Sequence, residues 1–221
     1  MAIQESLTEL AKKVPQGCTL VAVSKTQPPE IIREAHDGGQ RVFGENRAQE
    51  LASKYEILPK DIEWHMIGHL QTNKVKYIAP FVTLIQSVDS VKLLEEINRQ
   101  GMKTDRVIPC LLQIHIAEEE TKFGFSADEV FHLVSSERWT SLQHIRVKGL
   151  MGMATFTQNE QQVRKEFRNL KILFEKLRAH ALPASMSMEE LSMGMSSDFK
   201  IALEEGSTMI RVGTAIFGQR K

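Results

Sequence analysis

A single lysine stands where a buried strand gives way to a loop, a position that could make it a nucleophile. Residues 20–23 (LVAV) form an apolar run without alternation, typical of a parallel strand covered on both faces. Pro28 and Pro29 end this strand, because proline lacks the N–H that a ladder needs. Lys25 therefore lies at the carboxyl end of the strand, where parallel α/β folds bind ligands. Desolvation there favours its neutral, nucleophilic amine; an ordinary solvated lysine is the alternative.

Two segments near the C-terminus could hold a phosphate. Residues 192–198 (SMGMSSD) precede one expected helix, and residues 211–214 (RVGT) precede another. Backbone N–H groups at a helix N-terminus attract anions, hydroxyl side chains add donors, and glycine lets the backbone approach closely. Either segment alone could equally cap a helix or make a turn, but the two together favour a phosphate site. The residues expected around the phosphate are Ser196, Ser197, Gly213 and Thr214.

Arg211 falls near the end of the last expected strand, from which its side chain could reach the same site. A guanidinium group stays protonated and only donates hydrogen bonds, so it would suit an acceptor on a ligand. A surface salt bridge is the alternative role for this arginine.

Other residues with reactive side chains do not form a recognisable centre. His65 and His69 are four residues apart, which on a strand means about 13 Å, and no glutamate follows His65 as in zinc proteases. We therefore expect no metal site. Ser24 lacks the setting of a nucleophile elbow. Cys18 and Cys110 are too few for a disulfide framework.

Strands and helices alternate along the whole chain, without a linker or a low-complexity tract. This alternation predicts a closed (β/α)₈ barrel of the TIM type, with an extra helix over residues 1–16 that lies across one end. An open doubly wound sheet is the alternative. We expect one domain over residues 1–221. In such barrels phosphates bind after strands 7 and 8, where both C-terminal segments fall. The expected strands cover residues 20–23, 41–46, 63–70, 81–88, 107–116, 147–154, 191–195 and 209–212.

The composition is that of an ordinary water-soluble protein. Among 221 residues, 28 are Lys or Arg and 28 are Asp or Glu, so no overall field favours nucleic acid or a membrane surface. No apolar run approaches ~18 residues, and the N-terminus lacks the apolar region of a signal peptide. We expect a cytoplasmic protein whose anion site is local.

Six segments of the chain resemble one family. The residues around Lys25, VSKT with a proline close behind, resemble the Schiff-base lysine segment of the pyridoxal 5'-phosphate homeostasis proteins, single-domain relatives of the alanine racemase barrel. The resemblance extends to a serine-rich turn at residues 192–198 and to a final R-x-G-T-x-I-F-G signature at residues 211–218. It also includes the segments 44–47 (GENR), 64–68 (WHMIG) with 70–74 (LQTNK), and 122–124 (KFG), although a glycine turn would explain the last equally well.

The resemblance implies a cofactor and roles for the site residues. Pyridoxal 5'-phosphate would be held on Lys25 as an aldimine, with Asn46 beside it and Arg211 facing the pyridine nitrogen. An arginine there keeps that nitrogen unprotonated and weakens the cofactor as an electron sink. The family role is vitamin B6 homeostasis without substantial catalysis, so no catalytic residue is assigned. We also expect amino acids as further ligands and transient contact with apoenzymes. The expected oligomeric state is a monomer.

Two enzymatic alternatives remain open at this stage. An amino-acid racemase needs acid/base groups on both faces of the substrate, and in alanine racemase a tyrosine from a separate C-terminal domain of the partner subunit serves the second face. Tyr55 and Tyr77 fall in helical stretches away from the strand ends, and we expect no counterpart of that domain. A lysine Schiff-base aldolase acting on a phosphorylated sugar explains Lys25 and the phosphate segments equally well, but would be colourless.

Overall fold

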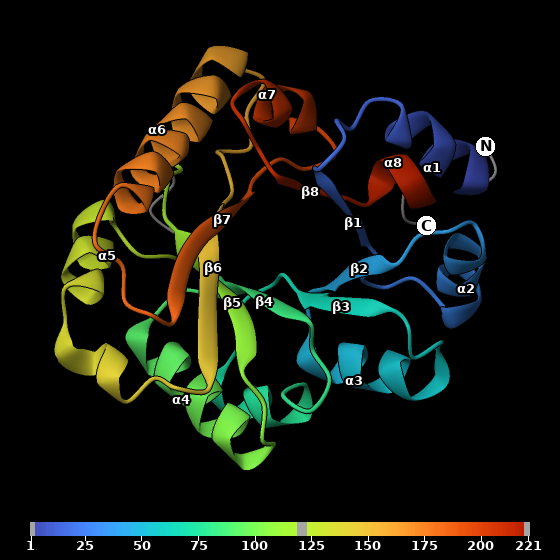
Figure 1. Cartoon of the computed structure of the whole chain (residues 1–221). Helices are drawn as coiled ribbons and strands as arrows, with labels where there is room; N and C mark the ends of the chain where they lie inside the picture. Colours follow the sequence, from blue (N-terminus) through green and yellow to red (C-terminus); the bar gives the residue numbers. More distant parts are fainter. Residues whose placement is uncertain (1–2, 119–122, 219–221) are drawn as a thin grey trace.

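The structure is a computed structural model that describes residues 3–118 and 123–218. Within that part, strands β1 to β8 close into a parallel barrel in chain order, and the helices form an outer ring (Figure 1). The strands are β1 (Thr19–Val23), β2 (Val42–Glu45), β3 (Glu63–Met66), β4 (Leu84–Val88), β5 (Ile108–Ile114), β6 (Ile145–Gly152), β7 (Met186–Ser192) and β8 (Met209–Val212). The helices are α1 (Ile3–Ala11), α2 (Pro29–Asp37), α3 (Ala48–Ile57), α4 (Val91–Lys103), α5 (Ala127–Val134), α6 (Glu160–Arg178), α7 (Phe199–Glu204) and α8 (Thr214–Phe217), with short 3₁₀ helices η1 (Thr72–Tyr77) and η2 (Glu137–Thr140).

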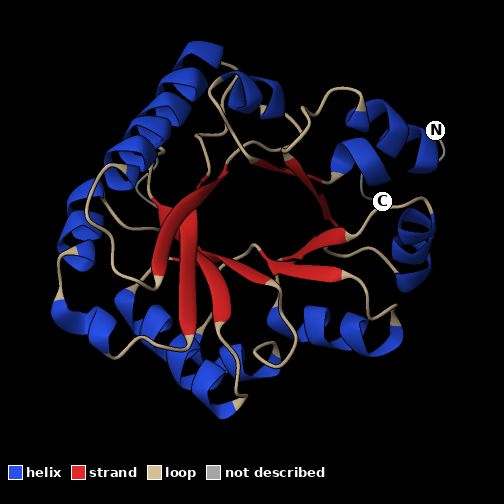
Figure 2. Cartoon of the chain, in the orientation of Figure 1, coloured by secondary structure: helices blue, strands red, loops and turns tan. Residues whose placement is uncertain are grey.

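Pairing between the first and last strands closes the barrel. β1 runs parallel to β8 in a register that begins at Thr19 opposite Met209 and ends at Ala22 opposite Val212. β1 also pairs with β2, so neither of its edges is open. Figure 2 shows the resulting ring of strands inside the ring of helices. The predicted (β/α)₈ barrel is confirmed, and the open sheet is excluded.

The core has two layers because side chains alternate between the two faces of each strand. A small cluster fills the barrel interior and includes Val21 of β1 and Met209 of β8, both almost fully buried. A larger cluster lies between the sheet and the helices and includes Ala22, the neighbour of Val21. Continuing the alternation, Val23 and Lys25 are on the same side as Val21, and they line the cavity at the barrel mouth.

Three elements differ from the prediction. β7 covers Met186–Ser192, whereas the expected strand was 191–195, because methionines alternate there with the half-exposed Ser187 and the exposed Glu189 and no apolar run marks the strand. Between β3 and β4, where the alternation of strands and helices predicts an α-helix, the chain forms the 3₁₀ helix η1. Val75 is its buried residue, so no broad apolar stripe supports an α-helix.

The third difference concerns the N-terminal helix. α1 packs against α8 and α2 within the outer ring and does not lie across an end of the barrel (Figure 1). Its buried residues Ile3, Leu7 and Leu10 belong to the cluster between the sheet and the helices. The apolar face of α1 is therefore buried from the outer ring. None of the described helices is long and apolar enough to cross a membrane.

Candidate functional site

A cavity of about 810 Å³ lies at the carboxyl ends of the strands. Its volume is within the range typical of small-molecule sites. The structure brings all seven predicted cofactor-binding residues to its wall: Lys25, Asn46, Ser196, Ser197, Arg211, Gly213 and Thr214. The other lining residues are Val23, Ile67, Gly68, His69, Gln113, Phe123, Met153, Phe156 and Met195.

The two C-terminal segments form one unit at this mouth. The N–H of Gly213 donates to Ser196 Oγ at 3.2 Å, which joins the loop after β7 to the loop after β8. Asp198 is the N-cap residue of α7 and its carboxylate accepts from the N–H of Met195 at 2.5 Å. Ser196 and Ser197 therefore do not serve as the N-cap of that helix, and both line the cavity.

Close backbone approach explains two glycines beside the cavity. A Cβ added to Gly213 would lie 3.2 Å from the carbonyl oxygen of Val23, and one added to Gly68 would lie 2.6 Å from that of Asn46. The second contact is too short for any real side chain. The residue after β8 thus lies close to the end of β1, and the loop after β3 lies against the backbone just after β2.

Arg211 lines the cavity with a buried side chain, which forms no salt bridge with the residues that the structure describes. Its guanidinium donates to Ser192 Oγ and, at 2.9 Å, to the carbonyl oxygen of Gly152. Burial lowers its pKa to about 10, with Asp198 opposing the shift, so it stays protonated near pH 7. The alternative of a solvated ion pair is wrong, because the side chain faces the barrel interior.

A chain of hydrogen bonds continues from Arg211 across the barrel. Because the guanidinium only donates, Ser192 Oγ accepts from it and gives its own hydrogen to Gln86 Oε1 at 2.7 Å. The Gln86 amide nitrogen then faces His65 Nδ1 at 2.9 Å, and an amide N–H can only donate. His65 must therefore carry its proton on Nε2 and be neutral. Burial, with a smaller effect from the positive charge of Lys148, lowers its pKa to about 3.

His69 occupies a different place from His65. Its Nδ1 contacts the carboxylate of Asp89 at 2.7 Å, and its ring stacks on Phe123 with centroids 4.3 Å apart. His69 and Phe123 both line the cavity, whereas His65 lies inside the barrel. Among the described residues, no group of three or more His, Cys, Asp and Glu side chains could hold a metal ion.

Several cavity residues were not predicted as part of the site. Gln113 stands near the end of β5 and donates to the carbonyl oxygen of Phe123 at 2.9 Å, so its strand-end position was a usable signal. Phe123 belongs to the KFG segment, whose family resemblance was a usable signal, whereas nothing in the sequence around Phe156 indicates the cavity. Met153 also lines the mouth, whereas Met151 packs inside the barrel. Lys122, part of the KFG segment, lies outside the described residues.

The two tyrosines are away from the cavity, as predicted. Tyr55 lies in α3 and stacks on Phe81, with ring centroids 3.8 Å apart. Tyr77 ends η1 with an exposed fraction of 44%. Neither is among the residues that line the cavity in the described part of the chain.

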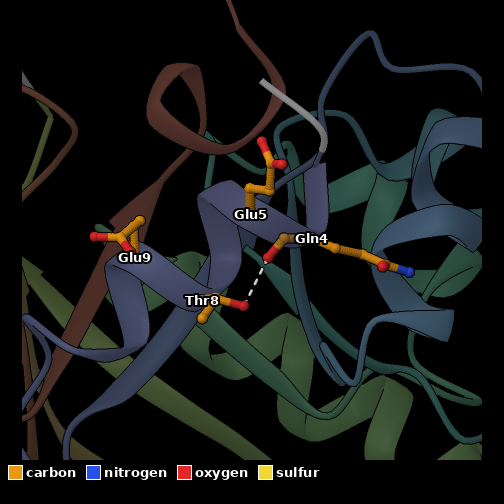
Figure 3. Close-up of a pocket in the computed structure, with 4 residues that line it drawn as sticks. All are labelled: Gln4, Glu5, Thr8 and Glu9. Atoms are coloured by element: carbon orange, nitrogen blue, oxygen red, sulfur yellow. Dashed lines mark hydrogen bonds between the residues drawn. The ribbon is translucent and has the colours of Figure 1, made fainter.

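A second hollow lies on α1, and its lining comes from that helix alone. Gln4, Glu5, Thr8 and Glu9 surround it (Figure 3). The one hydrogen bond drawn there runs from Thr8 Oγ1 to the carbonyl oxygen of Gln4 at 2.8 Å, a contact within one helical turn. This hollow brings no residues from different elements together, so we assign it no function.

The model of the alanine racemase N-terminal domain family matches residues 1–221, so the chain belongs to this family. The pyridoxal phosphate homeostasis protein of Aquifex aeolicus is 40% identical over 228 residues, and the alignment covers 98% of each chain. The mouse protein of the same name is 37% identical and is matched over 99% of this chain and 83% of its own.

Solved structures show the same relationship. PipY of Synechococcus elongatus with PLP bound matches with a TM-score of 0.85 at 34% identity, over 98% of this chain and all (100%) of that one. PipY without PLP gives 0.88 at 35% identity. Alanine racemase from Bartonella henselae, at 15% identity and a TM-score of 0.74, shares the fold, and the match covers 58% of its chain.

Proposed function

We propose that this protein binds pyridoxal 5'-phosphate on Lys25 and serves in vitamin B6 cofactor homeostasis. The observation that carries the proposal is that one cavity gathers a strand-end lysine, a hydroxyl-rich pair of loops and a buried arginine. The lysine amine suits an aldehyde, the hydroxyl groups suit a phosphate, and the arginine suits a pyridine nitrogen. The relatives named for pyridoxal phosphate homeostasis and the PLP complex of PipY support the same conclusion.

Each group has a distinct task in this proposal. Lys25 forms a Schiff base with the cofactor aldehyde, and Asn46 lies beside that linkage. Ser196, Ser197 and Thr214 supply hydroxyl donors to the phosphate. Gly213 lets the backbone approach it, and the N–H of Gly213, bound to Ser196 Oγ, holds the two loops together. Arg211 donates to the pyridine nitrogen from a guanidinium that Ser192 and Gly152 hold through two of its five N–H groups.

The arginine also supports a role without substantial catalysis. When bound, pyridoxal phosphate supplies an electron sink, which is strongest with a protonated ring nitrogen. The guanidinium of Arg211 is protonated near pH 7 and donates hydrogen bonds through its N–H groups. It therefore does not act as an acid that protonates the ring nitrogen. The guanidinium thus keeps the ring nitrogen as an acceptor, and the sink stays weak.

One observation favours a second candidate, an amino-acid racemase. His69, hydrogen-bonded to Asp89, is a proton carrier on the same cavity as Lys25. A racemase needs two such groups on opposite faces of its substrate. Proton exchange at Cα of single-enantiomer amino acids decides between the candidates.

The test of the main proposal is optical. The purified protein should be yellow or become yellow with pyridoxal phosphate, and borohydride should bleach the band and leave a pyridoxyl group on Lys25. If the protein is colourless and borohydride traps a Schiff base only with sugar phosphates, the protein is an aldolase. A pyridoxyl group on a lysine other than Lys25 would place the cofactor site elsewhere.

The proposal extends to a monomeric cytoplasmic carrier. Balanced charge, with 28 basic and 28 acidic residues, gives no overall field for a membrane or nucleic acid. Amino acids would act as ligands that release the cofactor from Lys25, and apoenzymes would be transient partners. Light scattering at several protein concentrations tests the monomeric state. Transfer of pyridoxal phosphate to an apoenzyme is tested by following the absorbance band on each protein.

A further inference from the structure

A buried lysine lies directly beneath the turn that carries Lys25. Lys54, in α3, has a side chain that is only 7% exposed. Its ammonium nitrogen lies 2.8 Å from the carbonyl oxygen of Ser24, 2.8 Å from Glu45 Oε1 and 2.7 Å from Glu50 Oε1. An ammonium has three donors, and all three are used here.

The two carboxylates also hold the residues on either side of Lys25. Ser24 Oγ donates to Glu45 Oε1 at 2.6 Å, and the N–H of Thr26 donates to Glu50 Oε1 at 2.7 Å. Lys54, Glu45 and Glu50 therefore form one unit, the Lys54 clamp, that fixes Ser24 at two atoms and Thr26 at one. Lys25 is the residue between them.

The turn that carries Lys25 contains one residue with a strained backbone conformation. Thr26 has φ of 65°, a left-handed conformation that a β-branched residue rarely adopts. Such residues persist where the surroundings over-determine them, and they are concentrated at functional sites. The hydrogen bond from Thr26 to Glu50 supplies that constraint at the strained residue itself.

The charges within the clamp are unequal. Burial raises the pKa of Glu45, and Lys54 only partly offsets it, whereas the pKa of Glu50 is lowered because hydrogen bonds from Lys54 and Thr26 outweigh its desolvation. These opposite directions favour the charged carboxylate more at Glu50 than at Glu45. Burying charged groups costs free energy, and apolar residues of similar volume often stabilise a fold as well as a buried ion pair does. Stability alone therefore does not explain the Lys54 clamp.

We infer that the Lys54 clamp is a positioning device that orients the Lys25 amine for its reaction with the cofactor aldehyde. The inference rests on the proposed function and deepens it. Neutral Lys25 adds to the aldehyde carbon, a C=N bond forms, and the aldehyde oxygen leaves as water with the two amine hydrogens. Glu45, Glu50 and Lys54 act only through the turn, so they set the rate of this step and leave the phosphate contacts unchanged.

The experiment follows the absorbance band after mixing each protein with pyridoxal phosphate or with unphosphorylated pyridoxal. Glu50→Ala frees the Thr26 N–H, and Lys54→Met removes three donors while keeping the alkyl length. We expect both variants to slow band formation about tenfold to a hundredfold with both ligands, the penalty typical of a misplaced reacting group. The ratio of the two affinities should stay as in the wild type.

A matched control separates positioning from general destabilisation. Val130→Ala removes buried methyl groups of α5, outside the cavity lining, and gives a stability loss against which the clamp variants are compared. Wild-type rates in Glu50→Ala, or a slowing equal to that of Val130→Ala at the same Tm, would overturn the inference while leaving the proposed function intact. If Lys54→Met does not fold, Glu50→Ala decides alone, because Glu50 is partly exposed. Absence of a band in the wild type would overturn both.

Discussion

The main-chain N–H of Gly213 points at Ser196 Oγ across 3.2 Å, so two loops that follow different strands share one hydrogen bond at the cavity wall. A hydroxyl that accepts this bond still has its own hydrogen to donate. Ser196 thus keeps one donor for an anion and is held beside Gly213 before any ligand arrives, which reduces the ordering cost of binding.

Thr214→Val tests the phosphate cradle. The variant keeps the shape of the side chain but removes one hydroxyl donor, and losing a hydrogen bond to a charged group costs about 1.5–3 kcal/mol. We expect binding of pyridoxal phosphate to weaken by about tenfold to a hundredfold while pyridoxal binding hardly changes. Titration of both ligands by absorbance measures this, with the exposed Thr140→Val as a control. Equal weakening for both ligands would place the phosphate elsewhere.

Lys25→Ala tests the covalent linkage. Without the amine no C=N bond can form, so the variant should purify without the long-wavelength band and should yield no pyridoxyl peptide after borohydride. Phosphate contacts remain, and we therefore expect weak, reversible binding of pyridoxal phosphate by calorimetry. Lys60→Met, a change at an exposed lysine beyond the end of α3, should keep the band. A band of wild-type intensity in Lys25→Ala would rule out Lys25 as the attachment site.

His65 gives the stability of the protein a pH dependence. Its pKa is about 3 in the folded protein against 6.5 as the ordinary value, because burial disfavours the charged form. A depressed pKa means that the unfolded chain takes up the proton first, so the stabilisation present above pH 6.5 is lost as the pH falls toward 3. Between pH 7 and pH 5 this amounts to ~2 kcal/mol.

Urea unfolding of the wild type and of His65→Gln isolates that contribution. Glutamine does not titrate, and the other ionisable groups are common to both proteins, so their effects cancel in the difference. We expect the wild type to lose ~2 kcal/mol more than the variant between pH 7 and pH 5. Parallel losses would mean that His65 is protonated in the folded protein, against the hydrogen-bond direction argued from Arg211.

Amino acids in deuterated water test the absence of substantial catalysis. With a weak electron sink, the loaded protein should exchange Cα–H slowly and produce no net racemisation of a single enantiomer. Ordinary enzymes turn over at ~1–10³ per second, so such a rate would establish the racemase. In that event His69→Phe, which removes the ring nitrogens paired with Asp89, should abolish the exchange. Any slow residual exchange should be the same in the wild type and His69→Phe.

Local patterns in the sequence determined the alternation of strands and helices and the strand-end position of Lys25. A buried parallel strand has to be apolar on both faces and has to end where proline removes the ladder donor, so these features are visible in a few residues. The capping box from Ser126 to Glu129 is another such case, and both of its hydrogen bonds are present. β7 was misplaced because its methionines alternate with polar residues.

Only the tertiary structure decided which side chains meet. Closure of β1 on β8 brings Lys25 and Arg211 to one cavity although 186 positions separate them in the chain. Glu50 and Lys54 stand four apart on one helix, a spacing at which opposite charges can pair on any helix. The burial of Lys54 under the Lys25 turn, between Glu50 and Glu45 of β2, follows from how α3 packs on the barrel. Side-chain contacts between distant segments depend on strand register and helix packing, and no local pattern encodes either of them.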